Sequence, residues 1–328
     1  MNIFNKKSIR VLLATQFVLC FTALSTLFAQ DEPLWNALQQ NFKKKYFSVG
    51  ALLQVVGDGQ LERSFQGTTG FNISNMRLNF SGELDGGFGY FFQANFIHSP
   101  TILDARLSYR LSQSLTLDVG QFKAPFSAEF LITASSIDMV NRSQGVSLLA
   151  PGRQIGAQLR GWLSKDVLHF STGLFNGNTT RHNSNDNNNF LYAGRLALNP
   201  LKATADNSAN SLELGLNFAY SKDERATVLG GLYSNFEGTR NLIGGDFRWS
   251  NGNILLSGEI ISATLEFPNE TQNKPWGYHL TGGMMLKEKS QLLLRWDNMT
   301  FDINTLESDL IVLGYNLWPT QATEVQIN

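Results

Sequence analysis

The chain has 328 residues, of which 42% are hydrophobic and only 16% are charged, and its formal net charge is -1. This composition excludes an intrinsically disordered chain, and a net charge near zero excludes a protein that binds nucleic acid through a basic surface. A folded protein without a nucleic-acid partner remains.

The first segment in chain order is predicted to be a secretory signal peptide, residues 1–29. Lys6, Lys7 and Arg10 precede an apolar run over residues 11–28, and Ala29 supplies a small residue at the cleavage site. Such a signal directs the mature chain out of the cytoplasm. Beyond residue 30 no apolar run is long enough for a second membrane-spanning helix.

A membrane anchor and a lipoprotein signal at Cys20 are the two alternatives for this segment. A lipoprotein site has small residues before its cysteine, whereas Val18 and Leu19 stand there, so the cleaved signal is favoured. Cleavage after Ala29 removes the only cysteine, and the mature chain then has no disulfide. Residues 30–45 follow as a short periplasmic segment.

From residue 46 onward, alternation of apolar and polar side chains is the strongest pattern in the chain. Met76, Leu78 and Phe80 fall on one face of a predicted strand, while Arg77 and Asn79 fall on the other. About fifteen such segments occur, each near the length with which a tilted strand crosses a bilayer. They begin near Tyr46, Gly70, Gly87, Leu103, Ser114, Arg153, Asp166, Phe190, Ser211, Asn241, Asn253, Gly277, Ser290, Asp309 and Gln321.

The connections between these segments alternate between short and long. Short connections lie at residues 85–86, 112–113, 164–165, 250–252, 287–289 and 319–320. Long connections lie at residues 57–69, 123–152, 176–189, 222–239, 265–276 and 298–308. A brief connection at 98–102 and an overlong one at 200–210 are the exceptions. Alternation of this kind gathers the short turns at one end of a barrel and the long loops at the other.

The polar face of the strands carries too much charge for a dry protein core. Its charged residues are Arg77, Arg106, Arg110, Arg160, Arg195, Arg248, Glu259, Arg295 and Asp297. This face is therefore predicted to line a lumen that holds water and ions, and the apolar face to meet lipid. The predicted fold class is all-β, a transmembrane antiparallel β-barrel over residues 46–328.

When the brief 98–102 connection is counted as the second loop at this end of the barrel, the 123–152 connection is the third. It interrupts the alternation of apolar and polar residues for about thirty residues. Because the lumen of a wide barrel is not filled by side chains, we expect this loop to fold inward and narrow the lumen. Lys123, Glu129, Asp138 and Arg142 would set the charge at the narrowing. The alternative is an external loop that caps the mouth.

Several segments of the chain carry a family resemblance through their order and spacing. They are FNISNMRLNFSGEL (71–84), VGQFKAPFS (119–127), VNRSQ (140–144), GRQIGAQLRG (152–161), GLFNGN (173–178) and GRLALNP (194–200). Together they resemble the phosphate-selective porin O and P family from about Val49 to the end of the chain. The block around Gly120 is the most specific part of this likeness.

The resemblance implies a sixteen-stranded barrel of the bacterial outer membrane, usually a homotrimer, whose third loop folds into the pore. Members pass small solutes, and some select phosphate through arginines and lysines that line the channel. The family often has paired arginines just before an alanine-arginine step, whereas this chain has Ser74-Asn75-Met76-Arg77 there, so only Arg77 matches; Arg142 matches the family's loop arginine. The expected loop lysine falls near Phe130 and Leu131. With fifteen predicted segments, the family's last strand is expected to be missing from this chain.

The wall of the lumen also departs from a purely cationic one. Presumptive lumen positions hold Asp104, Asp118, Glu213, Asp246, Glu259 and Asp297. A phosphate path needs a preponderance of donors and positive charge, so the mixed wall does not predict phosphate selectivity.

No catalytic, metal-binding or cofactor motif is recognisable. His98, His169, His182 and His279 stand outside any nucleophile or metal-ligand pattern. The asparagine-rich loop at 178–189 lacks the carboxylates of a calcium site. The prediction is a porin in outer-membrane lipid with no enzymatic activity and no cofactor, a passive pore for small solutes that Arg77, Lys123 and Arg142 bias toward anions at the third loop. The alternative is a non-conducting structural or adhesive barrel that acts through its loops at 176–189 and 222–239.

Overall fold

The structure is a computed structural model, and it describes residues 44–58, 70–97, 99–164, 166–179, 184–201, 210–303 and 306–328. The predicted signal peptide, most of the 30–45 segment and the larger part of the 57–69 loop lie outside the described residues, as do His98 and His182.

One antiparallel sheet of 16 strands forms the protein, and its long strands follow one another in chain order. They are β1 (Ser48–Asp58), β2 (Gly70–Glu83), β3 (Phe88–Asn95), β4 (Thr101–Ser112), β5 (Leu115–Lys123), β6 (Arg153–Ser164), β7 (Leu168–Phe175), β8 (Leu191–Leu201), β9 (Asn210–Val228), β10 (Tyr233–Asn251), β11 (Ile254–Glu266), β13 (Trp276–Lys287), β14 (Ser290–Thr300), β15 (Glu307–Thr320) and β16 (Thr323–Ile327). The short β12 (Gln272–Asn273) pairs only with β11. Each long strand corresponds to one predicted segment, which confirms the predicted fold class.

The hairpin of β9 and β10 is longer than the alternation predicted. β10 begins at Tyr233 rather than near Asn241, and the hairpin turns through a 3-10 helix at Leu229–Gly231. The run Lys222–Arg225 is charged on both faces of the strand and hides the alternation there. The predicted 222–239 loop is therefore mostly strand, and register shifts near its tip let the hairpin bend.

The two faces of the sheet have the reverse polarity of a soluble protein. Leu216 and Ile243 are each 66% exposed and Ile311 is 80% exposed, whereas Arg195 and Arg295 on the opposite face are only 7% and 3% exposed. Strands with an apolar outward face and a polar inward face are those of a transmembrane barrel. Among the described residues, no helix is long and apolar enough to cross a bilayer.

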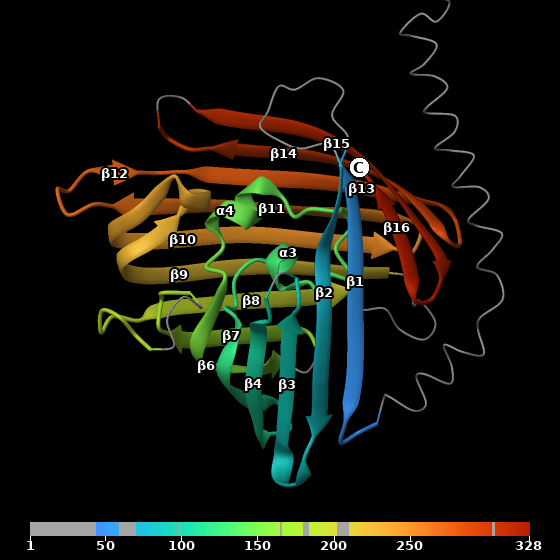
Figure 1. Cartoon of the computed structure of the whole chain (residues 1–328), viewed down its shortest axis with the longest axis horizontal. Helices are drawn as coiled ribbons and strands as arrows, with labels where there is room; N and C mark the ends of the chain where they lie inside the picture. Colours follow the sequence, from blue (N-terminus) through green and yellow to red (C-terminus); the bar gives the residue numbers. More distant parts are fainter. Residues whose placement is uncertain are drawn as a thin grey trace, which may run out of the picture.

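Residues 124–152 form loop 3, which connects β5 to β6 and carries helices α3 (Ala128–Leu131) and α4 (Gln144–Leu149). In Figure 1, β1–β4 run nearly upright and β8–β14 nearly horizontal, so the sheet curls, and α3 and α4 lie in front of its central strands. Helix α4 contacts β11, β13 and β14 and also the tip of the β9–β10 hairpin. Loop 3 therefore covers the polar face of these strands.

An apolar cluster lies between loop 3 and the wall. From loop 3 it takes Phe126, Val146 and Leu149, all at most 4% exposed, and from the hairpin tip it takes Leu229. The wall supplies Phe122, Phe175, Leu191, Ala193, Ala219, Leu242, Ile261, Ala263, Leu265 and Met299. Because burial of apolar side chains stabilises by about 25 cal/mol per Å², this cluster holds loop 3 and the hairpin tip in place as one packed unit.

Gly120, in the block that carries the family resemblance, is required by the backbone. Its φ is +128°, and a Cβ there would lie 2.0 Å from the carbonyl oxygen of Ala105 on the neighbouring strand. We expect Gly120→Ala to lower the free energy of unfolding by about 1–3 kcal/mol, because an L side chain strains both the φ angle and the strand pairing. The temperature at which the folded band disappears in semi-native electrophoresis measures this loss. An unchanged transition would show that the strand accommodates the side chain.

Candidate functional site

Glu129 at the start of α3 joins loop 3 to the wall. Its Oε1 accepts a hydrogen bond of 2.7 Å from Nη2 of Arg295 on β14, and its Oε2 accepts bonds from the amide and hydroxyl of Ser143 at 2.9 and 2.7 Å. Nε2 of His279 on β13 lies 3.7 Å from the same carboxylate. Burial by itself raises the pKa of Glu129, but Arg295, His279 and Ser143 outweigh it and hold the pKa below its usual value. Glu129 is therefore a buried carboxylate anchor.

Ser127 makes the second anchor, just before α3. It caps the helix by accepting a bond of 3.0 Å from the amide of Phe130, and its hydroxyl donates to Oε2 of Glu259 on β11 at 3.0 Å. Its own amide donates to Oδ1 of Asn217 on β9 at 3.1 Å. The turn that brings these groups together has a left-handed φ of 69° at Ser127.

Two further contacts hold the later part of loop 3. The amide of Gln144, at the start of α4, donates to both carboxylate oxygens of Asp297 on β14, at 3.2 and 3.0 Å. Arg248 on β10 makes a bidentate ion pair with Asp138, at 2.7 and 2.9 Å. At each anchor, a carboxylate of the wall or of loop 3 thus accepts the hydrogen bonds that join the two.

Arg195 on β8 forms ion pairs with carboxylates of the next two strands, β9 and β10. Its guanidinium donates to Asp246 and to Glu213, the latter at 2.7 Å, and also to Oδ1 of Asn217 at 2.8 Å. Arg195 and Asp246 are both buried. This network leaves neither group facing open water.

Lys123 and Arg142, predicted to set the charge of the narrowing, lie together at the end of α3. Lys123 Nζ donates to the carbonyl oxygens of Phe130 and Ile132 at 2.6 and 2.8 Å, and Arg142 Nη2 donates to that of Ile132 at 2.7 Å. Both cations therefore satisfy carbonyl groups that the short helix leaves free. Arg77 on β2 lies close enough to Lys123 and Arg142 for their like charges to repel one another.

On the opposite wall, β4 to β6 present arginines to the lumen around one buried carboxylate. Asp118 is completely buried and accepts from Arg160 at 2.6 Å, from Ser108 at 2.5 Å and from Gln158 at 2.8 Å, with Arg106 at 3.9 Å. The side chains of Arg106, Arg160 and Arg110 are 31%, 37% and 60% exposed. Water in the lumen therefore meets the guanidinium groups and not the carboxylate.

Some residues of this arrangement were not predicted as site residues from the sequence. Ser127, Gln144, Asn217 and His279 contact loop 3 or lie on its anchors, and Arg153 pairs with Asp104 at 3.0 and 3.2 Å. A list of all polar residues on the inward face of the strands would have included Asn217, His279 and Arg153, but not the loop residues Ser127 and Gln144. Which of them meet loop 3 depends on how the loop folds.

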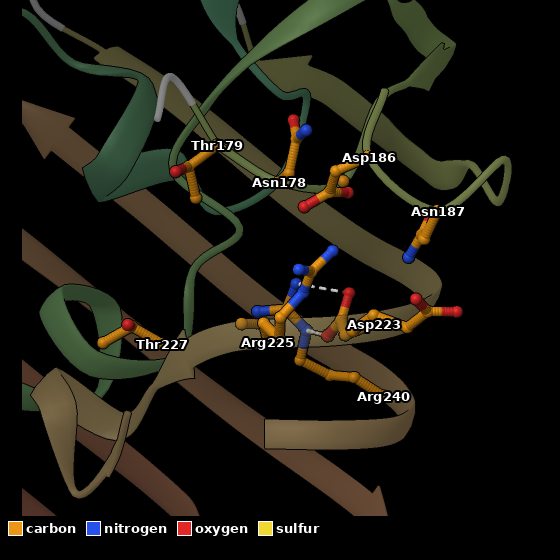
Figure 2. Close-up of a pocket in the computed structure, with 11 residues that line it drawn as sticks. Asn178, Thr179, Asp186, Asn187, Asp223, Arg225, Thr227 and Arg240 are labelled. Atoms are coloured by element: carbon orange, nitrogen blue, oxygen red, sulfur yellow. Dashed lines mark hydrogen bonds and ion pairs between the residues drawn. The ribbon is translucent and has the colours of Figure 1, made fainter. Parts of the chain in front are cut away.

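At the long-loop end, residues 177–179 and 186–187 meet the β9–β10 hairpin around a small pocket (Figure 2). Asp223 and Arg240 form a buried ion pair of 3.0 Å, and the Asn187 amide donates to the carbonyl of Lys222 at 3.0 Å. In Figure 2, the side chain of Arg225 points up between Asp223 and Asp186. Among the described residues, no group of three or more His, Cys, Asp or Glu side chains is placed to hold a metal ion.

Comparison with known proteins agrees with this architecture. The family model of the phosphate-selective porin O and P matches residues 56–264, more than half of the chain. No match was found among curated proteins.

Three solved structures show the same fold. An anion-selective porin from Comamonas acidovorans has a TM-score of 0.64 at 15% identity, with 85% of this chain and 87% of that chain covered. The outer membrane channel DcaP of Acinetobacter baumannii has a TM-score of 0.57 at 10% identity, covering 87% and 90%. The trimer form of OmpT from Vibrio cholerae has a TM-score of 0.56 at 9% identity, covering 86% and 87%. The chain is thus a porin of the bacterial outer membrane, and it belongs to the phosphate-selective porin O and P family.

Proposed function

We propose that this porin is a passive diffusion channel that favours anions and carries out no chemical step. The observation that carries the proposal is the unequal exposure of its charges. Of the six carboxylates at the lumen positions, Asp104, Asp118, Asp246, Glu259 and Asp297 are each at most 9% exposed, and Glu213, whose side chain is 40% exposed, is paired with Arg195. Arg106 and Arg110 of β4 and Arg160 of β6 keep about a third or more of their side chains exposed. A mixed wall can then act as a cationic one, because a permeating ion is attracted by the charges that it can approach.

Loop 3 contributes to this preference in two ways. It is proposed to narrow the channel on the side of β9–β14, where Glu129, Asp138 and the wall carboxylates are paired with Arg295, Arg248 and Arg195. Its Lys123 and Arg142, together with Arg77, then face the remaining opening from the β2–β6 side. An ion that passes loop 3 is therefore expected to meet more positive than negative charge.

The assembly proposed for the chain is a homotrimer. The support is the fold shared with the trimer form of OmpT from Vibrio cholerae, together with the family resemblance. Each protomer would carry its own channel and its own loop 3. The outward leucines and aromatic residues then meet either lipid or a neighbouring protomer.

The reversal potential across a tenfold gradient of potassium chloride tests the anion preference in a planar bilayer. The wild-type channel is expected to favour chloride over potassium, and the pair Arg110→Gln and Arg160→Gln is expected to reduce the permeability ratio about threefold, since two exposed guanidinium groups are lost. Arg225→Gln is the matched control, because it removes one exposed arginine at the long-loop end. A cation-selective wild type would overturn the preference. A folded barrel that passes no current would favour a structural or adhesive role for its loops.

A further inference from the structure

A cavity of about 710 Å³ lies at the short-turn end of β1–β6, away from loop 3. Its lining includes Lys44, Lys45, Arg106, Arg110, Arg160 and Phe91. Sites for small organic ligands occupy about 300–1,000 Å³, so the cavity has the size of an organic molecule and is far larger than a single inorganic anion needs.

Strand pairing brings together the residues that form the floor of this cavity. Glu83, Gly89, Ser108 and Asp118 stand side by side across β2 to β5 on the inward face. A Cβ at Gly89 would lie no closer than 3.5 Å to any neighbour, the nearest being the carbonyl oxygen of Gly82. A side chain at Gly89 would therefore make only ordinary van der Waals contacts there, so its atoms would extend into the cavity without a clash.

An aromatic ring borders this floor. Phe91 points inward two residues beyond Gly89 on β3 and pairs across the sheet with Arg106, whose guanidinium carbon lies 5.8 Å from the centre of the ring. Phe91 keeps part of its surface exposed. A flat apolar group in a charged lumen offers stacking to a ligand that has a ring, and it offers nothing to phosphate.

Arginine donors border the other side of the floor. Arg110 and Arg160 each pair across the sheet with Thr116, so they lie in one row, two residues beyond the row of Gly89. The one ion pair of Arg110 within the described residues is a long contact of 3.8 Å with Glu83, and both side chains are about 60% exposed. The guanidinium of Arg110 is thus available to an incoming carboxylate, with which it can form a bidentate pair.

We propose that this cavity binds organic anions that combine a flat ring with a carboxylate, so that the channel has a binding site for aromatic acids at its periplasmic end. The ring lies over Gly89 beside Phe91, and the carboxylate accepts hydrogen bonds from Arg110 and Arg160. This inference rests on the proposed anion preference, which brings such solutes into the lumen, and it adds the class of solute that is retained.

Titration calorimetry of the refolded protein in detergent tests the site, with benzoate as the probe and acetate and inorganic phosphate as comparisons. Benzoate is expected to bind at least about tenfold more tightly than acetate, since both have one carboxylate and only benzoate has a ring. Gly89→Leu, which fills the floor, and Arg110→Gln, which removes the donor, are each expected to weaken benzoate about tenfold. Two matched controls should leave its affinity unchanged: Gly194→Leu, on the outward face of β8, and Arg225→Gln, at the other end of the barrel.

The outcomes separate this inference from the anion preference. Equal affinity for benzoate and acetate, or benzoate binding that survives Gly89→Leu, would overturn the proposed site even when the bilayer measurement shows chloride selectivity. Benzoate binding that is lost in Gly89→Leu and retained in Gly194→Leu supports the site, and because calorimetry needs no current, it does so even for a channel without anion preference. Phosphate that competes with benzoate at equal concentration would also count against the role of the ring.

Discussion

Glu129→Ala is expected to release loop 3 from the wall and to be the most destabilising single substitution in the loop. Arg295 is 3% exposed and would lose its carboxylate partner, while the amide and hydroxyl of Ser143 would lose their acceptor. Removing one member of a buried ion pair costs about 3–5 kcal/mol, because the remaining charge is left without compensation. The same change also leaves His279 without its nearby carboxylate.

Thermal unfolding in semi-native electrophoresis and single-channel recording together measure this effect. We expect a lower transition temperature and larger current fluctuations, since the freed loop samples the lumen. Glu237→Ala removes an exposed carboxylate on β10 and serves as the control. The double substitution Glu129→Leu and Arg295→Met should recover most of the lost stability, because it leaves no unpaired charge. Quiet channels in Glu129→Ala would show that the apolar cluster alone holds the loop.

The strands could be predicted from the sequence because each of them crosses the membrane with one polar and one apolar face. In β9, the outward leucines at 214 and 216 alternate with Glu213, Gly215 and Asn217. The exception is the part of β9 beyond Tyr220: Lys222 to Arg225 are all charged, although exposed and buried residues still alternate through Asp223. The alternation of apolar and polar residues therefore no longer identifies the strand in this part of the chain, although the strand continues.

The site could be predicted only in part, since sequence gives the face of a charged residue and not its partner. Arg295 was correctly assigned to the inward face, but its carboxylate partner, Glu129, is 166 residues away in the chain. No spacing rule links a loop residue to a strand so distant. For the same reason the sequence could not show that Arg110 and Arg195 differ in exposure. Arg110 is open to water, whereas Arg195 is buried in ion pairs with Asp246 and Glu213.

This distinction changes how the mixed charge of the wall is interpreted. Counted as formal charges, the carboxylates at the lumen positions appear to oppose anion passage. In the structure, burial and pairing separate the two signs: Asp118 is covered by three donors, and Asp297 is covered by the first turn of α4. The electrostatic potential that a permeating ion experiences depends mainly on the charges it can approach. In accessible charge, the wall therefore departs less from the family's cationic pattern than a count of formal charges in the sequence suggests.

Gly277→Val is expected to push α4 away from the wall and to change the conductance of the channel. Gly277 on β13 and Gly145 on α4 pack backbone against backbone: a Cβ at Gly277 would lie 3.0 Å from the Cα of Gly145 and 2.9 Å from the carbonyl oxygen of Asn298. Both contacts are with backbone atoms, which cannot rotate away as the end of a flexible side chain can. Overpacking of this kind costs about 1–3 kcal/mol, and the loop is the part that can move.

The same strand offers a matched control that separates loop displacement from a general loss of strand stability. Gly282 also lies on β13 but faces outward, and a Cβ there would meet only the end of the Leu256 side chain, at 3.7 Å. Gly282→Val should therefore leave conductance and thermal stability close to wild type, and valine favours the strand. If both valine variants change the conductance equally, strand distortion is the cause. If only Gly277→Val changes it, the close approach of the two glycines is what fixes α4, and with it the width of the channel.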